Sequence, residues 1–565
     1  MNLERRSHET LALGFVALFA LSLVMYFLVR YNGVFSIVDV AVFTNAANSV
    51  VETGTVTEGP NYSNGFGYPA LVGALSLLTG VSVPVLQLYV MPFGLLLTLG
   101  AGYLAIRAMY DRRTAIFGAL LLFMHPFLLF STFRSTHEKF TYALIFLTLF
   151  TLYQSFRRRE GEVKVQYILL SYFFVFGMIF YNVFFSSAFI VAIGTSVFGT
   201  ALLMIYFGHD IELRRLSYTV LISFVMLIFT VLFVYPPSRS FLFSLGPSII
   251  QGMSLLLGNA PSATGTQPYQ TVFTEWQSFG TYLVLISFYL IVFPIAGLTW
   301  LYRGYKILKI DVANELPIGE IFVLILFGVF SLQLFGAVIV DQLGILVGTN
   351  MQLRVLPIIG FISIILTASA VIRSYRWMSK PTEEESEEQT TGIITNGDFY
   401  SVFEAVVSKA ISKPKAISLI FTILLVVSLV GFAGAATIKA SSDPAISTNW
   451  IFSTQEEQKG MDWINTHTSE DYVWVGYNER IRTGYTIRYP EKPVQNTYDI
   501  AGVDLATHVV MRSSTMEELA NAAGVPHPPV DDAHLIYSNG QTQFYRYDEY
   551  RTLDEFNDAL RGEQE

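Results

Sequence analysis

Apolar runs of about twenty residues recur along this 565-residue chain, and they limit its possible folds more than any other feature. A helix needs roughly 20 apolar residues to cross a hydrocarbon core of about 30 Å. Hydrophobic residues make up 52% of the chain and charged residues only 14%, which is too apolar for a soluble protein of this length. We therefore expect a polytopic α-helical membrane protein with about eleven spans. The predicted spans are residues 9–29, 83–106, 114–131, 140–156, 166–182, 185–206, 217–235, 281–301, 319–340, 354–372 and 416–437.

Lysine and arginine collect in alternate connections between these spans. Such clusters mark the cytoplasmic side of a membrane protein. With the spans above, the basic clusters all fall on one side; they are residues 5–6, 107–113, 157–159, 214–215, 303–309 and 373–376. We expect a multi-pass protein of the cell membrane with a cytoplasmic N-terminus and, since the span count is odd, an external C-terminal segment.

The composition changes after residue 437. Residues 438–565 hold 21 Asp and Glu against 10 Lys and Arg, and this acidic balance argues against a nucleic-acid partner. A helical pattern near residues 455–465 and apolar, strand-like stretches predict a small soluble α/β domain. The strand-like stretches are 472–478, 508–514, 533–539 and the segment after the Asn539-Gly540 turn, which is typical of a tight hairpin.

This division gives a transmembrane domain over residues 1–437 and an extracytoplasmic α/β domain over residues 438–565. The acidic segment 380–400 is expected to be a cytoplasmic linker, because its composition is typical of a solvated chain. The predicted external loops are residues 34–67, 132–139, 236–280 and 341–353. Sites are commonly built on loops above a rigid scaffold, so we expect function on the external face.

Charged residues in these loops are the candidates for chemistry. Asp39 lies in an apolar stretch at helical spacing, which predicts an amphipathic helix on the membrane surface. The second loop packs Arg134, His137, Glu138 and Lys139 into six residues between two apolar spans. Arg354 opens the tenth predicted span on the external side, against the usual cytoplasmic bias of arginine.

Each candidate also has a purely structural interpretation. Asp39 can be a solvated carboxylate or a helix cap, and the charged second loop can be ordinary loop capping and snorkelling at the membrane interface. Arg354 can form a salt bridge to Asp341 or to another loop carboxylate. Tyr181 and Asn182, at an outer helix end, fit interface anchoring better than contact with a sugar.

One carboxylate combined with fixed cations suits sugar transfer from a polyprenyl phosphate. A carboxylate can act as general base toward an acceptor hydroxyl, and Arg or Lys can stabilise the negative charge of a departing phosphate. A phosphate is already a good leaving group, so a second, acidic carboxyl group is not required, unlike in hydrolysis of a simple glycoside.

The sequence resembles the membrane glycosyltransferases of the GT-C superfamily, especially the protein O-mannosyltransferase-like and archaeal dolichyl-phosphate-sugar transferases. The likeness rests on Asp39 in D-x3-F-x2-A-A, on Gly67-Tyr68-Pro69-Ala70-Leu71 before a short helix, on His137-Glu138-Lys139 and on Arg354-Val355-Leu356-Pro357. In such families an acidic residue of the first external loop is the catalytic base, and basic residues of later loops hold the donor phosphate.

The resemblance implies that Asp39 is the base, that Arg134, Lys139 and Arg354 hold phosphate, and that His137, Glu138 and Tyr68 orient the acceptor. The first loop has one Asp where the protein O-mannosyltransferases usually carry Asp-Glu, and Val355 stands where an aromatic residue is common. The C-terminal segment has no WWDYG-like motif, which argues against transfer of a finished glycan to asparagine.

The function predicted here is inverting transfer of a hexose, mannose by preference, to a lipid-linked or protein-linked glycan on the outer face. The partners are the bilayer, a polyprenyl-phosphate sugar and the acceptor, with no obligatory cofactor or metal, since one His beside one Glu is a poor metal site. A secondary transporter is the main alternative, although transporters place ionisable groups near the bilayer midplane and in repeated halves. The second alternative is a non-catalytic receptor with an external binding domain. The oligomeric state stays open.

Overall fold

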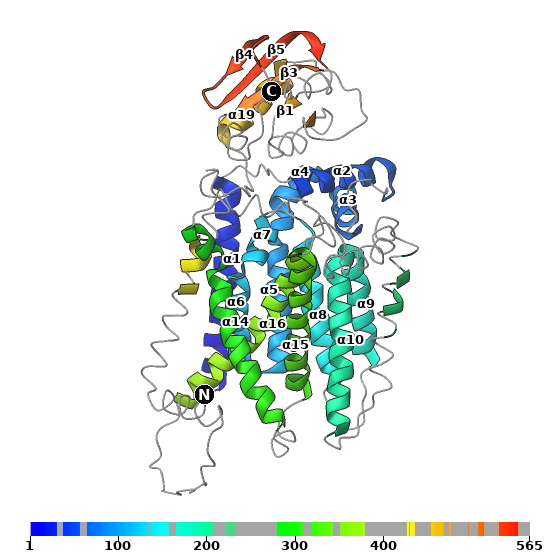
Figure 1. The fold of residues 1–565 in the computed structure, drawn as a ribbon, viewed down its shortest axis with the longest axis vertical. Helices are drawn as coiled ribbons and strands as arrows, with labels where there is room; N and C mark the ends of the chain where they lie inside the picture. Colours follow the sequence, from blue (N-terminus) through cyan, green and yellow to red (C-terminus); the bar gives the residue numbers. More distant parts are fainter. Residues whose placement is uncertain are drawn as a thin grey trace, which may run out of the picture.

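The computed structural model describes residues 2–30, 38–56, 65–133, 136–156, 165–206, 279–308, 318–342, 351–378, most of 427–434, 454–467, 507–513 and 530–551, with a few isolated residues between 221 and 232 and the strand pairs 474–475 and 495–496. Long helices packed side by side form a bundle, and a shorter helix, α2, runs across one end of it (Figure 1). We call this end of the bundle the α2 end.

Each predicted span that falls in the described residues overlaps one or more of the described helices. They are α1 (Asn2–Arg30), α2 (Val38–Thr53), α3 (Gly67–Thr79), α4 (Val83–Val85), the π turn η1 (Leu86–Val90), the 3-10 turn η2 (Met91–Phe93), α5 (Gly94–Met109), α6 (Arg112–Phe123), α7 (Pro126–Phe133), α8 (Glu138–Phe156), α9 (Val165–Tyr181), α10 (Val183–Tyr206), α14 (Phe279–Leu308), α15 (Ile318–Gln342) and α16 (Met351–Met378).

Within the described residues, four helical segments are long and apolar enough to cross a membrane, namely Val83–Met109, Val183–Leu203, Gly319–Val340 and Arg354–Arg376. The bent pair α6 and α7 makes a fifth if it counts as one span. The predicted spans 217–235 and 416–437 fall mostly outside the described residues, so the total of about eleven stays a prediction.

The predicted single span 114–131 is wrong in shape, because the chain bends by 62° between α6 and α7. Pro126 follows the bend and explains it: proline has no N–H for the helical ladder and disfavours helical backbone at the residue before it. That residue, His125, is fully buried, and its Nε2 lies 3.3 Å from the Tyr289 hydroxyl of α14.

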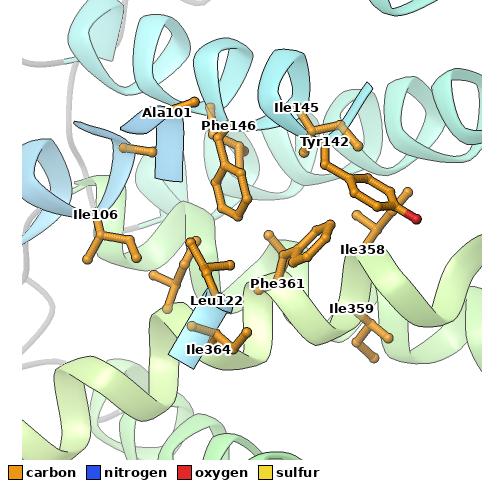
Figure 2. Packing of buried hydrophobic residues seen from close by; sticks show 14 of the residues in the cluster. Ala101, Ile106, Leu122, Tyr142, Ile145, Phe146, Ile358, Ile359, Phe361 and Ile364 are labelled. Atoms are coloured by element: carbon orange, nitrogen blue, oxygen red, sulfur yellow. The ribbon is translucent and has the colours of Figure 1, made fainter. Parts of the chain in front are cut away.

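The core of the bundle is apolar and aromatic. Figure 2 shows Leu122 of α6, Tyr142 and Phe146 of α8 and Phe361 of α16 packed against one another. The ring of Phe361 meets those of Tyr142 and Phe146 at centroid distances of 4.8 and 5.3 Å. Offset and edge-on aromatic pairs of this kind add to the stabilisation that burial gives. This core fixes the helices whose ends meet at the α2 end.

An ion-pair network joins the helices at the opposite end of the bundle. Glu320 of α15 pairs with Arg303 of α14 at 2.5 Å and with Arg373 of α16 at 2.7 Å. Arg303 also donates to the hydroxyl of Ser369 at 3.0 Å, which gives its buried guanidinium a second partner. Arg376 forms an exposed pair with Asp111 in the connection between α5 and α6.

A five-stranded sheet and one helix are described in the C-terminal segment. The helix α19 (Gln455–His467) precedes strands β1 (Trp474–Val475), β2 (Gln495–Asn496), β3 (Thr507–Ser513), β4 (Ala533–Ser538) and β5 (Thr542–Arg551), in the spatial order β2-β1-β3-β5-β4. β1 pairs in parallel with β2 and β3, whereas β5 pairs antiparallel with β3 and β4. Figure 1 shows this sheet beyond the α2 end of the bundle.

The predicted hairpin is confirmed. Ser538 pairs with Gln543, and Gly540 in the connecting turn has φ +91°, a region that glycine occupies without a steric cost. The Asn539 side chain accepts from the backbone N–H of Thr542 at 2.8 Å and donates to the carbonyl of Glu456 at 2.8 Å, so the turn is also tied to α19. The predicted domain boundary at residue 438 lies outside the described residues.

Candidate active site

The helix that carries Asp39 docks on the bundle through one buried face. Phe43 is 1% exposed, and its ring meets those of Tyr68 on α3 and His137 before α8 edge-on, at centroid distances of 5.1 and 5.0 Å. The buried Thr44 hydroxyl donates to Gln87 Oε1 in the π turn at 2.6 Å. Rigid aromatic contacts and a buried hydrogen bond therefore fix α2 across the end of the bundle.

Asp39 lies in the first turn of α2, four residues before Phe43. Residues four apart in a helix share a face, so the backbone of Asp39 stands one turn from the point where α2 meets His137. The side chain of Asp39 is outside the described part of the structure, and so are residues 31–37 and 57–64 around this helix. The predicted amphipathic helix is present, and the role of Asp39 as base stays a prediction.

Two glycines let the start of α3 lie directly against the end of α9. At Gly65, with φ +153°, an added Cβ would come within 2.5 Å of the Tyr181 carbonyl oxygen. At Gly67 it would come within 2.9 Å of the Tyr181 ring. The predicted short helix after Gly67 is confirmed as α3, and its Tyr68 is fully buried against Phe43.

The charged second loop is buried rather than interfacial. Thr136, His137, Glu138 and Lys139 are each exposed by 6% or less. The Thr136 hydroxyl donates to Glu138 Oε2, and His137 Nδ1 lies 3.9 Å from the same oxygen. Snorkelling does not fit side chains that are this deeply buried, whereas loop capping, the other half of the structural interpretation, agrees with the hydrogen bonds of Thr136 and Lys139. Arg134 lies outside the described residues.

Lys139 holds this loop together from inside. Its ammonium donates to the carbonyl of Ser131 at 3.2 Å and to that of Thr136 at 2.9 Å, which joins the last turn of α7 to the loop. On α5, Gly94 leaves room for the lysine stem, and the Thr98 hydroxyl donates to the Lys139 carbonyl at 2.6 Å. Burying an ammonium is costly unless it is hydrogen-bonded, and these carbonyls meet part of that requirement. Contact between Lys139 and a donor phosphate stays a prediction.

Asn182 belongs to this site, and its interpretation as an interface anchor is wrong. It is fully buried between α9 and α10, with Nδ2 2.6 Å from His137 Nε2 and Oδ1 accepting from the Phe185 N–H at 3.0 Å. Tyr181 beside it stacks on Phe140 of α8 at 5.6 Å. The helical ends were visible in the sequence, but a contact between residues 45 positions apart was not.

Arg354 stands in the first turn of α16 at the same end of the bundle. Its half-buried guanidinium lies 5.7 Å from the ring centroid of Phe184 and 5.8 Å from that of Phe185, both on α10. Such cation–π contacts hold a guanidinium in place while leaving its charge uncancelled. The side chain of Asp341, the alternative partner, lies outside the described residues.

The second turn of α2, the residue before α8 and the first turns of α10 and α16 thus meet in one continuous set of contacts. Phe43 touches His137, His137 bonds Asn182, Asn182 caps the turn at Phe185, and Phe185 packs beneath Arg354. A carboxylate on α2, a carboxyl group at Glu138 and the cation of Arg354 therefore belong to elements fixed at the same end. Within the described residues, no three His, Asp or Glu side chains come together as a metal site.

The chain shares its fold with solved structures of an archaeal oligosaccharyltransferase, a membrane enzyme of the GT-C fold class that the sequence resembles. The oligosaccharyltransferase of Archaeoglobus fulgidus in its apo form is similar over 98% of this chain and 76% of its own, with 11% identity and a TM-score of 0.55. The same archaeal enzyme, AglB, in complex with an inhibitory peptide and a dolichol-phosphate, is similar over 97% and 75% of the two chains, with 12% identity and a TM-score of 0.52.

ArnT from Cupriavidus metallidurans bound to undecaprenyl phosphate is a more distant likeness, covering 94% of this chain and 97% of its own at 11% identity and a TM-score of 0.45. No protein-family model and no curated protein matches the chain by sequence. The structural likeness at these low identities defines the fold, and the activity has to be argued from the site.

Proposed function

We propose that this protein is an inverting membrane glycosyltransferase that moves a hexose from a polyprenyl phosphate to a glycan acceptor at the α2 end. The observation that carries the proposal is the run of contacts that joins α2, through His137, to the first turns of α10 and α16. Asp39, the sequence-predicted base, belongs to α2, and Arg354 belongs to the first turn of α16. Support comes from the fold shared with an archaeal enzyme that binds a dolichol-phosphate.

The chemistry is a single displacement at the anomeric carbon. The Asp39 carboxylate takes the proton of the acceptor hydroxyl as its oxygen forms the new bond to that carbon. The bond from the same carbon to the phosphate oxygen breaks, its electron pair stays on the phosphate, and the polyprenyl phosphate leaves. One displacement inverts the configuration.

The leaving phosphate gains negative charge during this step, and Arg354 is the described residue best suited to stabilise it. Its guanidinium is held by two aromatic rings without a carboxylate among its described contacts. A cation fixed before the reaction acts on the developing charge without reorganisation. Arg134 and Lys139 are proposed as further phosphate ligands, and Glu138, His137 and Tyr68 as residues that orient the acceptor.

A single hexose, mannose by the family resemblance, is the proposed cargo rather than a finished oligosaccharide. The C-terminal segment lacks a WWDYG-like motif, which argues against transfer of a finished glycan to asparagine. The acceptor is proposed to be a lipid-linked or protein-linked glycan outside the cell.

The test is transfer from labelled dolichyl-phosphate mannose in membranes that contain the intact protein or its Asp39→Asn or Arg354→Ala variant. Both changes are expected to lower the transfer rate by about a hundredfold or more, as loss of a general base or of a charge-stabilising donor does. Glu52→Gln is the matched control for Asp39, because Glu52 is an exposed carboxylate on the same helix. Arg376→Gln, at the far end of α16, is the control for Arg354. Undiminished transfer in Asp39→Asn would remove the assignment of the base.

A further inference from the structure

The orientation of the Asn182 amide is fixed by a backbone group. The Phe185 N–H can only donate, and it points at Asn182 Oδ1 at 3.0 Å, so the oxygen of the amide faces α10. The amino group, Nδ2, therefore faces His137, from whose Nε2 it lies 2.6 Å away. An amide turned the other way would set two donors against each other at the Phe185 N–H.

This orientation decides where the imidazole of His137 carries its proton. Asn182 Nδ2 has only donors, so His137 Nε2 must accept and cannot bear a proton. A neutral imidazole with a bare Nε2 carries its proton on Nδ1. The imidazolium form is disfavoured for the same reason, since its Nε2–H would oppose the amide N–H at 2.6 Å.

The Nδ1–H that results lies near the carboxylate of the site. Nδ1 lies 3.9 Å from Glu138 Oε2, which also accepts from the Thr136 hydroxyl. The distance is longer than a hydrogen bond, but a protonated Nδ1 this close to a buried carboxylate favours its charge more than an unprotonated nitrogen would. Asn182 therefore joins the cap of α10 to His137 by hydrogen bonds, and His137 lies beside the Glu138 carboxylate.

We propose that Asn182 is a positioning residue that holds His137 as the neutral Nδ1–H tautomer and thereby orients Glu138 toward the acceptor. Nε2 of His137 is then occupied by the protein itself and takes no part in binding donor phosphate. The link to sugar transfer rests on the proposed function, whereas the tautomer does not.

The direct test is nitrogen-15 NMR of the full-length protein in lipid bilayers at neutral pH, with labelled histidine. The chain has 8 histidines, and the His137 signals are those that disappear in His137→Gln. The expected wild-type spectrum has a protonated Nδ1 and an unprotonated Nε2. A protonated Nε2 in the wild-type protein would overturn the proposal.

Two variants separate the tautomer from the helix cap. Asn182→Asp and Asn182→Ser both keep a side-chain oxygen for the Phe185 N–H, as good caps do. In Asn182→Asp the carboxylate accepts, so Nε2 should become protonated. In Asn182→Ser the donor-only amide nitrogen is replaced by a shorter hydroxyl that can donate or accept, so the tautomer preference should disappear. Transfer in Asn182→Ser should fall about fivefold, as expected for one neutral hydrogen bond.

If both variants gave the same spectra and the same transfer rate as the wild-type protein, the positioning role would be contradicted. If the intact protein transfers no sugar from any donor tried, the proposed function fails, and the spectra still decide the tautomer. The two failures are therefore distinguishable.

Discussion

Replacing Gly65 with alanine tests whether the close approach of α3 to α9 positions the site. The new Cβ would lie 2.5 Å from the Tyr181 carbonyl oxygen and 2.6 Å from that of Phe180, and both are backbone atoms. Ordinary van der Waals contact begins near 3.4 Å, so one backbone segment must move by about 0.9 Å. We expect about 1–3 kcal/mol for the overpacking and about 1–3 kcal/mol for alanine at this φ.

The end of α9 that Gly65→Ala would displace is next to Asn182, which contacts His137. The transfer activity of this variant should therefore fall together with its stability. A misplacement near 1 Å can cost about a hundredfold in rate. The assays are thermal unfolding in detergent and transfer from labelled dolichyl-phosphate mannose. Gly54→Ala is the matched control, since Gly54 also has a positive φ, +70°, but has nothing within 4 Å of the added Cβ. If Gly65→Ala matches Gly54→Ala in both assays, the close packing has no role in forming the site.

Two further predictions concern the opposite end of the bundle. Glu320→Gln leaves the buried Arg303 without its carboxylate and should lower the free energy of unfolding by about 3–5 kcal/mol. Arg376→Gln breaks an exposed pair and should lower it by less than about 1 kcal/mol. Equal losses of thermal stability in the two variants would contradict this difference. Burial alone would raise the pKa of Asp111, but the Thr114 N–H and the Arg376 guanidinium outweigh it and hold the pKa below its ordinary value of 3.8. The ionised Asp111 therefore stabilises the fold above that pH, and the contribution is lost as the pH falls through the lowered pKa. When thermal stability is measured as a function of pH, Asp111→Asn should lose less stability on acidification than the wild-type protein does.

The sequence predicted most of the helices because spanning segments carry long, unbroken apolar runs. It also predicted the β4–β5 hairpin, since Asn539-Gly540 is a local signal that needs no tertiary information. The bend at Pro126 was missed although the proline was visible, because the apolar run continues across it. The two-residue strand β2 was missed because Gln495 and Asn496 are polar and give no apolar, strand-like stretch to detect, unlike the two residues of β1.

The candidate site was predicted as a set of residues but not as an arrangement. His137, Glu138 and Lys139 were chosen from their charge alone, and burial came only with the packing of α5 and α9 around them. Asn182 shows the limit most clearly. Its sequence neighbours suggest a helix end at the membrane interface, and only the fold reveals His137 as its partner.

The central claim is sugar transfer at the α2 end, and single-turnover transfer by the purified protein in lipid nanodiscs tests it most directly. Dolichyl-phosphate mannose labelled in the sugar is the donor, and the anomeric configuration of the product is read by NMR. We predict labelled product of inverted configuration together with an equal amount of free dolichyl phosphate. Movement of the unchanged donor or of free sugar across the bilayer, with no product from any donor and acceptor tried, would contradict the account and favour a transporter.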